Sequence, residues 1–175
     1  MESWSTYLSV NLNDILKTTE NSVETYKVII KQQKQQYTAL YWLGVRIKNN
    51  VQRFDATAYK QVEALRDLLA ELQKEQEELF HIACFICENT KKLLVRLEDA
   101  KADESEQGYR ELNNELRKLN EKLNELKERQ ENCLSSNARF AELVTMLSQE
   151  FQEKFSKKEK PFCARCKERL KKIIW

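Results

Sequence analysis

The chain has 175 residues, of which 41% are hydrophobic and 33% charged, with 30 basic and 28 acidic side chains. Only two glycines and one proline are present, so turns must be few and helices long. The near-balanced charge does not favour nucleic acid as a partner, and the apolar runs fall far short of the ~18–20 residues that cross a bilayer.

The first residues, Met1-Glu2-Ser3-Trp4, lack the basic segment followed by an apolar segment that is typical of a signal peptide. Five cysteines, an odd number, fit reduced thiols, so we expect an intracellular protein, cytoplasmic or cytoskeleton-associated, with the nucleus as an alternative.

Residues 1–11 hold apolar side chains without a sustained period, which predicts an N-terminal arm, with a short helix folded back on the main body as the alternative. From Leu12 a four-three rhythm of core-type positions begins: Leu12, Leu16, Thr19, Val23, Tyr26, Ile30, Gln33, Tyr37, Leu40, Gly44, Ile47, Val51, Phe54 and Ala58. Such a heptad pattern is typical of a helix that packs along another helix. Additional apolar residues around 26–47 widen the stripe, which favours contact with more than one neighbour.

A single long helical segment is predicted over residues 12–98, with a break near 55–57 as the alternative. Asp55 or Thr57 is suited to cap a new helix there, but no glycine or proline enforces a break. The stripe continues at Leu65, Leu68, Leu69, Leu72, Leu79, Ile82, Ile86, Leu93, Leu94 and Leu97. Residues 99–108 carry no apolar side chain larger than alanine and end in Gly108, which predicts a loop between antiparallel helices.

Residues 109–160 contain the most regular pattern and are predicted to form a long coiled-coil helix. Its seam comprises Leu112, Leu116, Leu119, Leu123, Leu126, Gln130, Cys133, Asn137, Phe140, Val144, Leu147 and Phe151. So narrow a stripe leaves its leucines in water unless a second helix covers them, so we interpret this seam as partner-binding. Polar residues at three core-type positions, Gln33, Gln130 and Asn137, are expected either to fix register or to lie partly exposed.

Residues 161–175 change character and are predicted to form a short basic element, including a short helix after Pro161. The basic docking residues that we single out are Lys157, Lys158, Lys160, Arg165, Lys167, Arg169, Lys171 and Lys172. Three partners fit such a segment, in decreasing order: an acidic protein surface such as a microtubule, an anionic membrane surface, and a nucleic-acid backbone.

Two Cys-x-x-Cys pairs raise the question of metal binding. Cys84 and Cys87 lie in an apolar helical stretch, where cysteine serves as a small hydrophobe, so we assign them no metal. Cys163 and Cys166 follow a proline among basic residues, and they are weak candidates for half of a zinc site. The single histidine, His81, is expected to be a partly buried helix residue rather than a catalytic base, and no catalytic or cofactor-binding residue is predicted.

These patterns predict an all-α fold: an elongated coiled-coil helical hairpin, or a bundle of three long helices, with a short basic C-terminal helix. Length, heptads and the lack of a catalytic loop resemble small coiled-coil subunits of kinetochore, centrosomal, ciliary and vesicle-tethering assemblies. That resemblance implies a non-enzymatic scaffold subunit that binds other coiled-coil chains as a homo- or hetero-oligomer, without cofactor or small-molecule substrate. The alternatives are a membrane-surface or vesicle-trafficking adaptor and a zinc-dependent nucleic-acid-associated factor.

Overall fold

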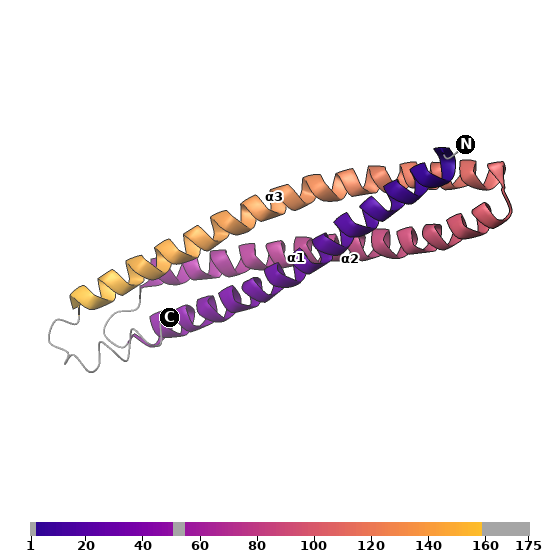
Figure 1. Cartoon of the computed structure of the whole chain (residues 1–175). Helices are drawn as coiled ribbons and strands as arrows, with labels where there is room; N and C mark the ends of the chain where they lie inside the picture. The colour runs from indigo at the N-terminus through magenta and orange to yellow at the C-terminus, as the bar shows by residue number, and fades with distance from the viewer. Residues whose placement is uncertain (1–2, 51–54, 159–175) are drawn as a thin grey trace. The chain divides into compact units, whose positions relative to one another are not determined.

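Three long helices make up the part of the chain that the computed structural model describes, residues 3–50 and 55–158, with side chains described as far as residue 153. They are α1 (Ser3–Lys48), α2 (Ala56–Ala102) and α3 (Glu106–Lys158), and no strand occurs among the described residues (Figure 1). The predicted all-α class is therefore confirmed. The predicted basic C-terminal helix lies outside the described residues.

The chain divides into two compact units, and each helix contributes a segment to both. The first unit comprises Met1–Ile29 and Glu75–Cys133, and the second comprises Ile30–Lys74 and Leu134–Trp175. In each unit, segments of α1, α2 and α3 contribute to the buried core.

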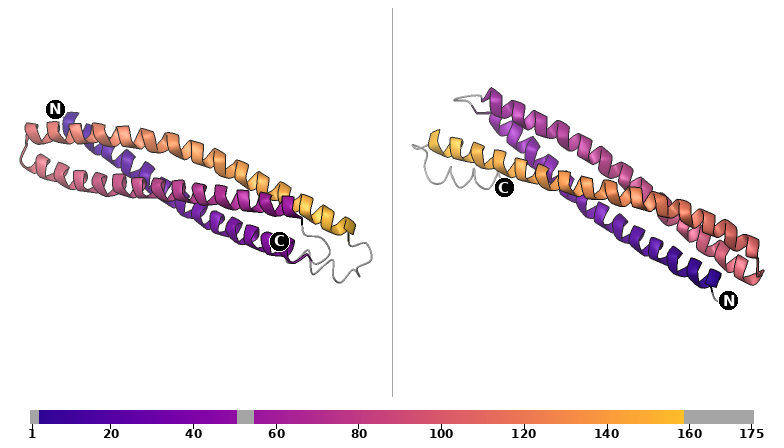
Figure 2. Two further views of the ribbon diagram at one scale, coloured as in Figure 1. Left: turned by 180° about the vertical axis from the view of Figure 1, so that it is seen from behind. Right: turned by 90° about the horizontal axis from the view of Figure 1, so that it is seen from above.

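The first unit has one continuous core. Its buried members are Leu8, Leu12, Ile15, Tyr26, Ile29, Leu79, Ala83, Ile86, Leu93, Leu97, Ala100, Leu112, Leu116, Leu119, Leu123, Leu126 and Cys133. The start of α1 lies beside the turn that joins α2 to α3, as both views of Figure 2 show, so α1 and α3 run parallel here and α2 runs antiparallel to them. On the surface, the Arg129 guanidinium forms a fork with Glu75, its Nε and one terminal nitrogen each 3.0 Å from a carboxylate oxygen.

The second unit has two smaller buried clusters. One contains Leu40, Leu69, Leu72 and Phe140. The other contains Leu43, Ile47, Ala58, Val62, Leu147 and Phe151. Each cluster draws residues from all three helices, so this unit too is held together by contacts between segments far apart in sequence.

The N-terminal arm that the sequence predicted over residues 1–11 is instead the first part of α1, which begins at Ser3. Leu8 is fully buried in the core of the first unit. Leu8, Leu12 and Ile15 follow one another at steps of four and three, so they continue the buried face of the helix toward its N-terminus. The prediction failed because Trp4, Tyr7 and Val10, which suggested an irregular arm, lie on the exposed side.

The break near residue 55 is present. α1 ends at Lys48, and Arg46 and Lys48 in its last turn complement the negative end of the helix dipole. α2 then begins at Ala56, where Asp55 is the N-cap residue: its side-chain Oδ1 accepts a hydrogen bond from the Ala58 amide at 3.0 Å. Of the two predicted arrangements, the continuous helix over residues 12–98 is therefore wrong, and Asp55 rather than Thr57 caps the new helix.

The turn between α2 and α3 is shorter than the predicted loop of residues 99–108, because helix continues to Ala102 and resumes at Glu106. Glu104 adopts a left-handed conformation, with φ 49°. The Ser105 amide donates to the Ala100 carbonyl at 3.1 Å and the Glu104 amide to the Lys101 carbonyl at 3.3 Å, which is the hydrogen-bond pattern of a Schellman motif. Ser105 then caps α3 by accepting from the Gly108 amide at 3.0 Å.

The buried positions of α2 keep a four-three rhythm along almost the entire helix. They are Ala58, Val62, Leu65, Leu69, Leu72, Gln76, Leu79, Ala83, Ile86, Thr90, Leu93, Leu97 and Ala100, of which Leu65 is half-buried and the others are buried. Thr90 is accommodated because its hydroxyl donates to the Ile86 carbonyl at 2.6 Å within the helix. The sequence pattern did not reveal this regularity, since Gln76 and Thr90 interrupt the apolar stripe.

Candidate interaction surface

The predicted seam of α3 faces the interior of the chain itself. Nine of its positions are buried, namely Leu112, Leu116, Leu119, Leu123, Leu126, Cys133, Phe140, Leu147 and Phe151. Gln130, Asn137 and Val144 are half-buried. In each unit these side chains pack against segments of α1 and α2. A partner chain therefore has no access to the seam unless the helices of the chain separate.

The phase predicted for α1 is half wrong. The buried positions include Leu12, Thr19, Tyr26, Gln33, Leu40, Gly44 and Ile47, as predicted. Between them, however, Ile15, Ser22, Ile29 and Leu43 are buried, whereas the predicted Leu16, Val23 and Ile30 are half-buried and Tyr37 is exposed. The face of α1 that meets the other helices is thus rotated by part of a turn, and Tyr37, predicted at a core-type position, lies on the surface.

Polar seam residues are partnered across helices. In the second unit the Gln33 Nε2 amide donates to Asn137 Oδ1 at 3.1 Å. In the first unit the Ser22 hydroxyl lies 3.5 Å from Gln130 Oε1, at the limit of a hydrogen bond. The predicted partner-specifying role of Gln130 and Asn137 is therefore at least partly taken up by contacts within the chain.

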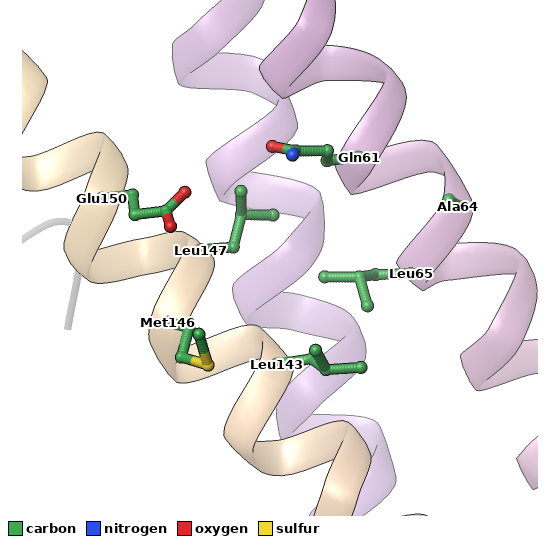
Figure 3. A pocket seen from close by; sticks show the side chains of 7 residues that line it. All are labelled: Gln61, Ala64, Leu65, Leu143, Met146, Leu147 and Glu150. Carbon is green, nitrogen blue, oxygen red and sulfur yellow. The ribbon is translucent and has the colours of Figure 1, made fainter.

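An apolar groove lies between α2 and α3 in the second unit, with a volume of 280 Å³. It is lined by Gln61, Ala64, Leu65, Leu143, Met146, Leu147 and Glu150. Figure 3 shows Gln61 and Leu65 projecting from α2 toward Leu147 and Leu143, which project from α3. Met146 on its rim has 56% of its surface exposed, and Leu143 38%. Both are large apolar side chains, and they lie one turn apart on α3 beside the groove.

The single histidine does not lie where the sequence placed it. His81 was expected to be partly buried, but it is exposed on α2, with Nε2 3.9 Å from the Glu77 carboxylate one turn earlier. Its ring also lies edge to face with the neighbouring Phe80, at 6.0 Å between centroids, so the structure gives His81 two contacts within its own helix.

Cys84 and Cys87 are free, half-buried thiols on α2. Burial raises the pKa of Cys87 above its ordinary value, with Lys91 acting in the opposite direction, so at neutral pH this thiol is not activated as a nucleophile. Among the residues that the structure describes, no group of three or more His, Cys, Asp or Glu side chains is placed to hold a metal ion. The zinc candidates Cys163 and Cys166 lie outside that part of the chain.

The basic docking residues also fall beyond what the structure describes. Lys157 and Lys158 belong to the last turn of α3, but their side chains are not described, and Lys160, Arg165, Lys167, Arg169, Lys171 and Lys172 follow the described residues. None of the three helices, over the residues described, contains a stretch apolar enough to span a bilayer.

Comparison with known proteins gives no relative: no protein-family model, curated protein or solved structure matches the chain.

Proposed function

We propose that this chain is a non-enzymatic structural subunit of a multi-protein assembly, a three-helix bundle of coiled-coil type that binds a helix of another chain in the α2–α3 groove. Its setting would be intracellular, in a kinetochore, centrosomal, cytoskeletal or similar assembly. The basic residues beyond α3 would dock that assembly on an acidic surface such as a microtubule.

The spacing of the buried residues supports a coiled-coil bundle. In α2 and α3 they recur at steps of four and three, the period of helices that wrap around one another. In each unit all three helices contribute to the core, which is the composition of a bundle layer rather than of a two-helix hairpin.

The groove is the observation that carries the proposed role. Its apolar walls, Leu65 and Leu143, lie on two neighbouring helices, and a valley between two packed helices is the site in which a further amphipathic helix docks. Met146 at the rim suits such a contact, because its unbranched side chain adapts to different partner surfaces. Gln61 and Glu150 provide polar groups at the edge, as is usual for a protein interface.

The proposal is tested by asking whether the chain forms a stoichiometric complex with a partner, and whether that complex depends on the groove. The doubly substituted chain Leu143→Glu with Met146→Glu should keep its helix content by circular dichroism but lose the partner that co-purifies with the unmodified chain in equimolar amount. A matched control, Val95→Glu, changes a more exposed apolar residue in the first unit, 65% exposed, and should retain the partner. Light scattering measures the mass of the complex that each variant forms, and so shows whether the partner is retained. Equal partner retention by the groove variant and the control would contradict the proposal.

A further inference from the structure

A second surface of the same unit has a different chemistry. On α1, Lys31, Lys34, Tyr41, Trp42 and Lys48 are all exposed, and we call them the basic-aromatic strip. Lys34 lies three residues after Lys31, and the aromatic pair lies seven and eight residues after Lys34. Lys48 follows that pair by seven and six residues. At 100° per residue all five lie within about a third of the helix circumference, so they share one side of the helix. Trp42 has 50% of its surface exposed and Tyr41 46%, so two large aromatic side chains face solvent between lysines.

Among the side chains of this unit that the structure describes, the excess of positive charge lies on α1. Residues 30–48 carry four basic side chains and no acidic one. Over the same unit, residues 56–74 of α2 carry three of each sign, and residues 134–153 of α3 carry one basic and three acidic side chains. Over the described side chains the strip is therefore a local excess of positive charge. Residues 154–172, with nine basic side chains and two acidic ones, are a second basic part of the chain.

The aromatic residues of the strip are held in a defined arrangement. The Tyr41 and Trp42 rings are 5.5 Å apart between centroids with their planes at 79°, an edge-to-face pair that limits the freedom of both. Nearby, the Arg66 guanidinium of α2 lies 6.0 Å from the centre of the Tyr37 ring. An indole and a phenol at the surface, each with an apolar body and a polar tip, match the headgroup region of a bilayer, where Trp and Tyr concentrate.

We infer that the basic-aromatic strip binds the surface of a membrane that contains anionic phospholipid, with α1 lying parallel to the bilayer. The lysines attract the lipid phosphates and carboxylates, and Trp42 and Tyr41 enter the interface between headgroups and chains. The strip extends over about 26 Å at 1.5 Å per residue, so it presents a line of contacts to a flat surface. An acidic protein would satisfy the lysines, but a flat bilayer also accommodates the exposed indole without a complementary pocket.

Flotation of the full-length chain with vesicles tests this inference. At 0.1 M salt the chain should float together with vesicles that contain three quarters phosphatidylcholine and one quarter phosphatidylserine. It should not float with vesicles of pure phosphatidylcholine. Each lysine near an anionic surface contributes about fivefold to binding, so Lys31→Gln with Lys34→Gln should weaken partitioning about 25-fold. Trp42→Ala should weaken it by a further factor of at least five, by analogy with the loss of one buried aromatic side chain at an interface.

Matched controls separate this surface from the other basic parts of the chain. Lys92→Gln with Lys127→Gln removes the same charge from exposed positions of the first unit and should leave vesicle binding unchanged. The groove variant Leu143→Glu with Met146→Glu should also float, so failure of the proposed subunit role and failure of this inference are distinguishable. The inference is overturned if the unmodified chain does not float with anionic vesicles. It is equally overturned if Lys31→Gln with Lys34→Gln floats like the unmodified chain while Lys171→Gln with Lys172→Gln does not. A third contradicting result is that the α1 lysines are required for binding to polyglutamate, an acidic polypeptide, but not for binding to vesicles.

Discussion

The two units are built from the same three helices but use them differently. The first has one continuous buried cluster that includes an unbroken leucine series on α3, from Leu112 to Leu126. The second has two separate clusters, one of them built around Phe140, and it carries the apolar groove and the basic-aromatic strip. Both units expose large apolar side chains, such as Tyr7 and Val95 in the first and Met146 and Trp42 in the second, so the difference between them lies in the core, which is continuous in the first unit and divided in the second.

The largest test of this contrast replaces one leucine in each unit with aspartate. Leu119→Asp places a charge in the buried core of the first unit and should destabilise the chain by about 4 kcal/mol or more, because no partner compensates the charge. Leu143→Asp, on the partly exposed groove wall of the second unit, should cost only about 1 kcal/mol, because 38% of that side chain is already in solvent. Urea unfolding followed by circular dichroism measures both, and similar losses in the two variants would remove the distinction between core and groove.

The amide pair of the second unit provides the next test. From sequence alone, leucine at position 137 should raise the melting temperature, because a polar residue in a seam costs stability. The structure reverses this expectation. Asn137→Leu removes the acceptor of the buried Gln33 amide, so the single substitution should cost about 1–2 kcal/mol.

Replacing both members of the pair is the control for that test. Gln33→Leu combined with Asn137→Leu leaves no amide without its partner and should return stability to near or above that of the unmodified chain. Thermal unfolding of the two single variants and the double variant forms a mutant cycle. A higher melting temperature for Asn137→Leu alone would show that the hydrogen bond does not hold Gln33 in place.

In the first unit the corresponding polar atom is the hydroxyl of Tyr26. The side chain is fully buried, and no hydrogen-bond partner for the hydroxyl occurs among the described residues. Tyr26→Phe should therefore stabilise the chain by about 1 kcal/mol, the lower end of the cost of a buried unsatisfied group.

The same substitution has a pH signature. Burial, more than the neighbouring Cys133, raises the pKa of Tyr26 above its ordinary value, so the folded chain favours the neutral phenol. The stability that the neutral phenol contributes is fully present below about pH 10, the pKa of tyrosine in the unfolded chain. It is lost as the pH rises beyond that value. Between pH 9 and 11 the unmodified chain should lose stability more steeply than Tyr26→Phe. Parallel curves for the two would indicate that the phenol has access to water.

Much of this fold could be predicted from the sequence, and the failures have physical reasons. The phase of the α3 seam was predicted correctly, with nine positions buried and three half-buried, because charged residues separate its leucines and leave only one apolar phase; its role in binding a partner stays a prediction. In α1 the phase is ambiguous from sequence, since adjacent pairs such as Ile15-Leu16 and Ile29-Ile30 offer an apolar side chain to either phase. The neighbouring helices decide between them, and a single sequence does not contain that information.

The candidate surfaces were harder to predict for the same reason. The wide apolar stripe over residues 26–47 suggested contact with several helices, yet Tyr41 and Trp42 remain exposed. The groove depends on Leu65 and Leu143, which belong to helices that run in opposite directions, so their proximity follows from the turn at residues 103–105. Only the packed arrangement shows which apolar residues have no neighbour.

The two glycines provide the smallest and most closely matched comparison of the units. In the second unit, a Cβ added at Gly44 would lie 3.5 Å from the Val62 side chain, an ordinary contact, so Gly44→Ala should stabilise the helix by about 0.5–1 kcal/mol through its higher propensity. In the first unit, a Cβ at Gly108 would lie 3.1 Å from Ser105 Oγ and 3.2 Å from Ala100 Cβ, beside the turn between α2 and α3. The crowding there should cancel the gain in propensity, so Gly108→Ala should be neutral or destabilising. If thermal unfolding instead shows equal gains for both substitutions, the turn of the first unit yields as easily as the helix packing of the second, and the contrast between a tightly built unit and an open one fails at that point.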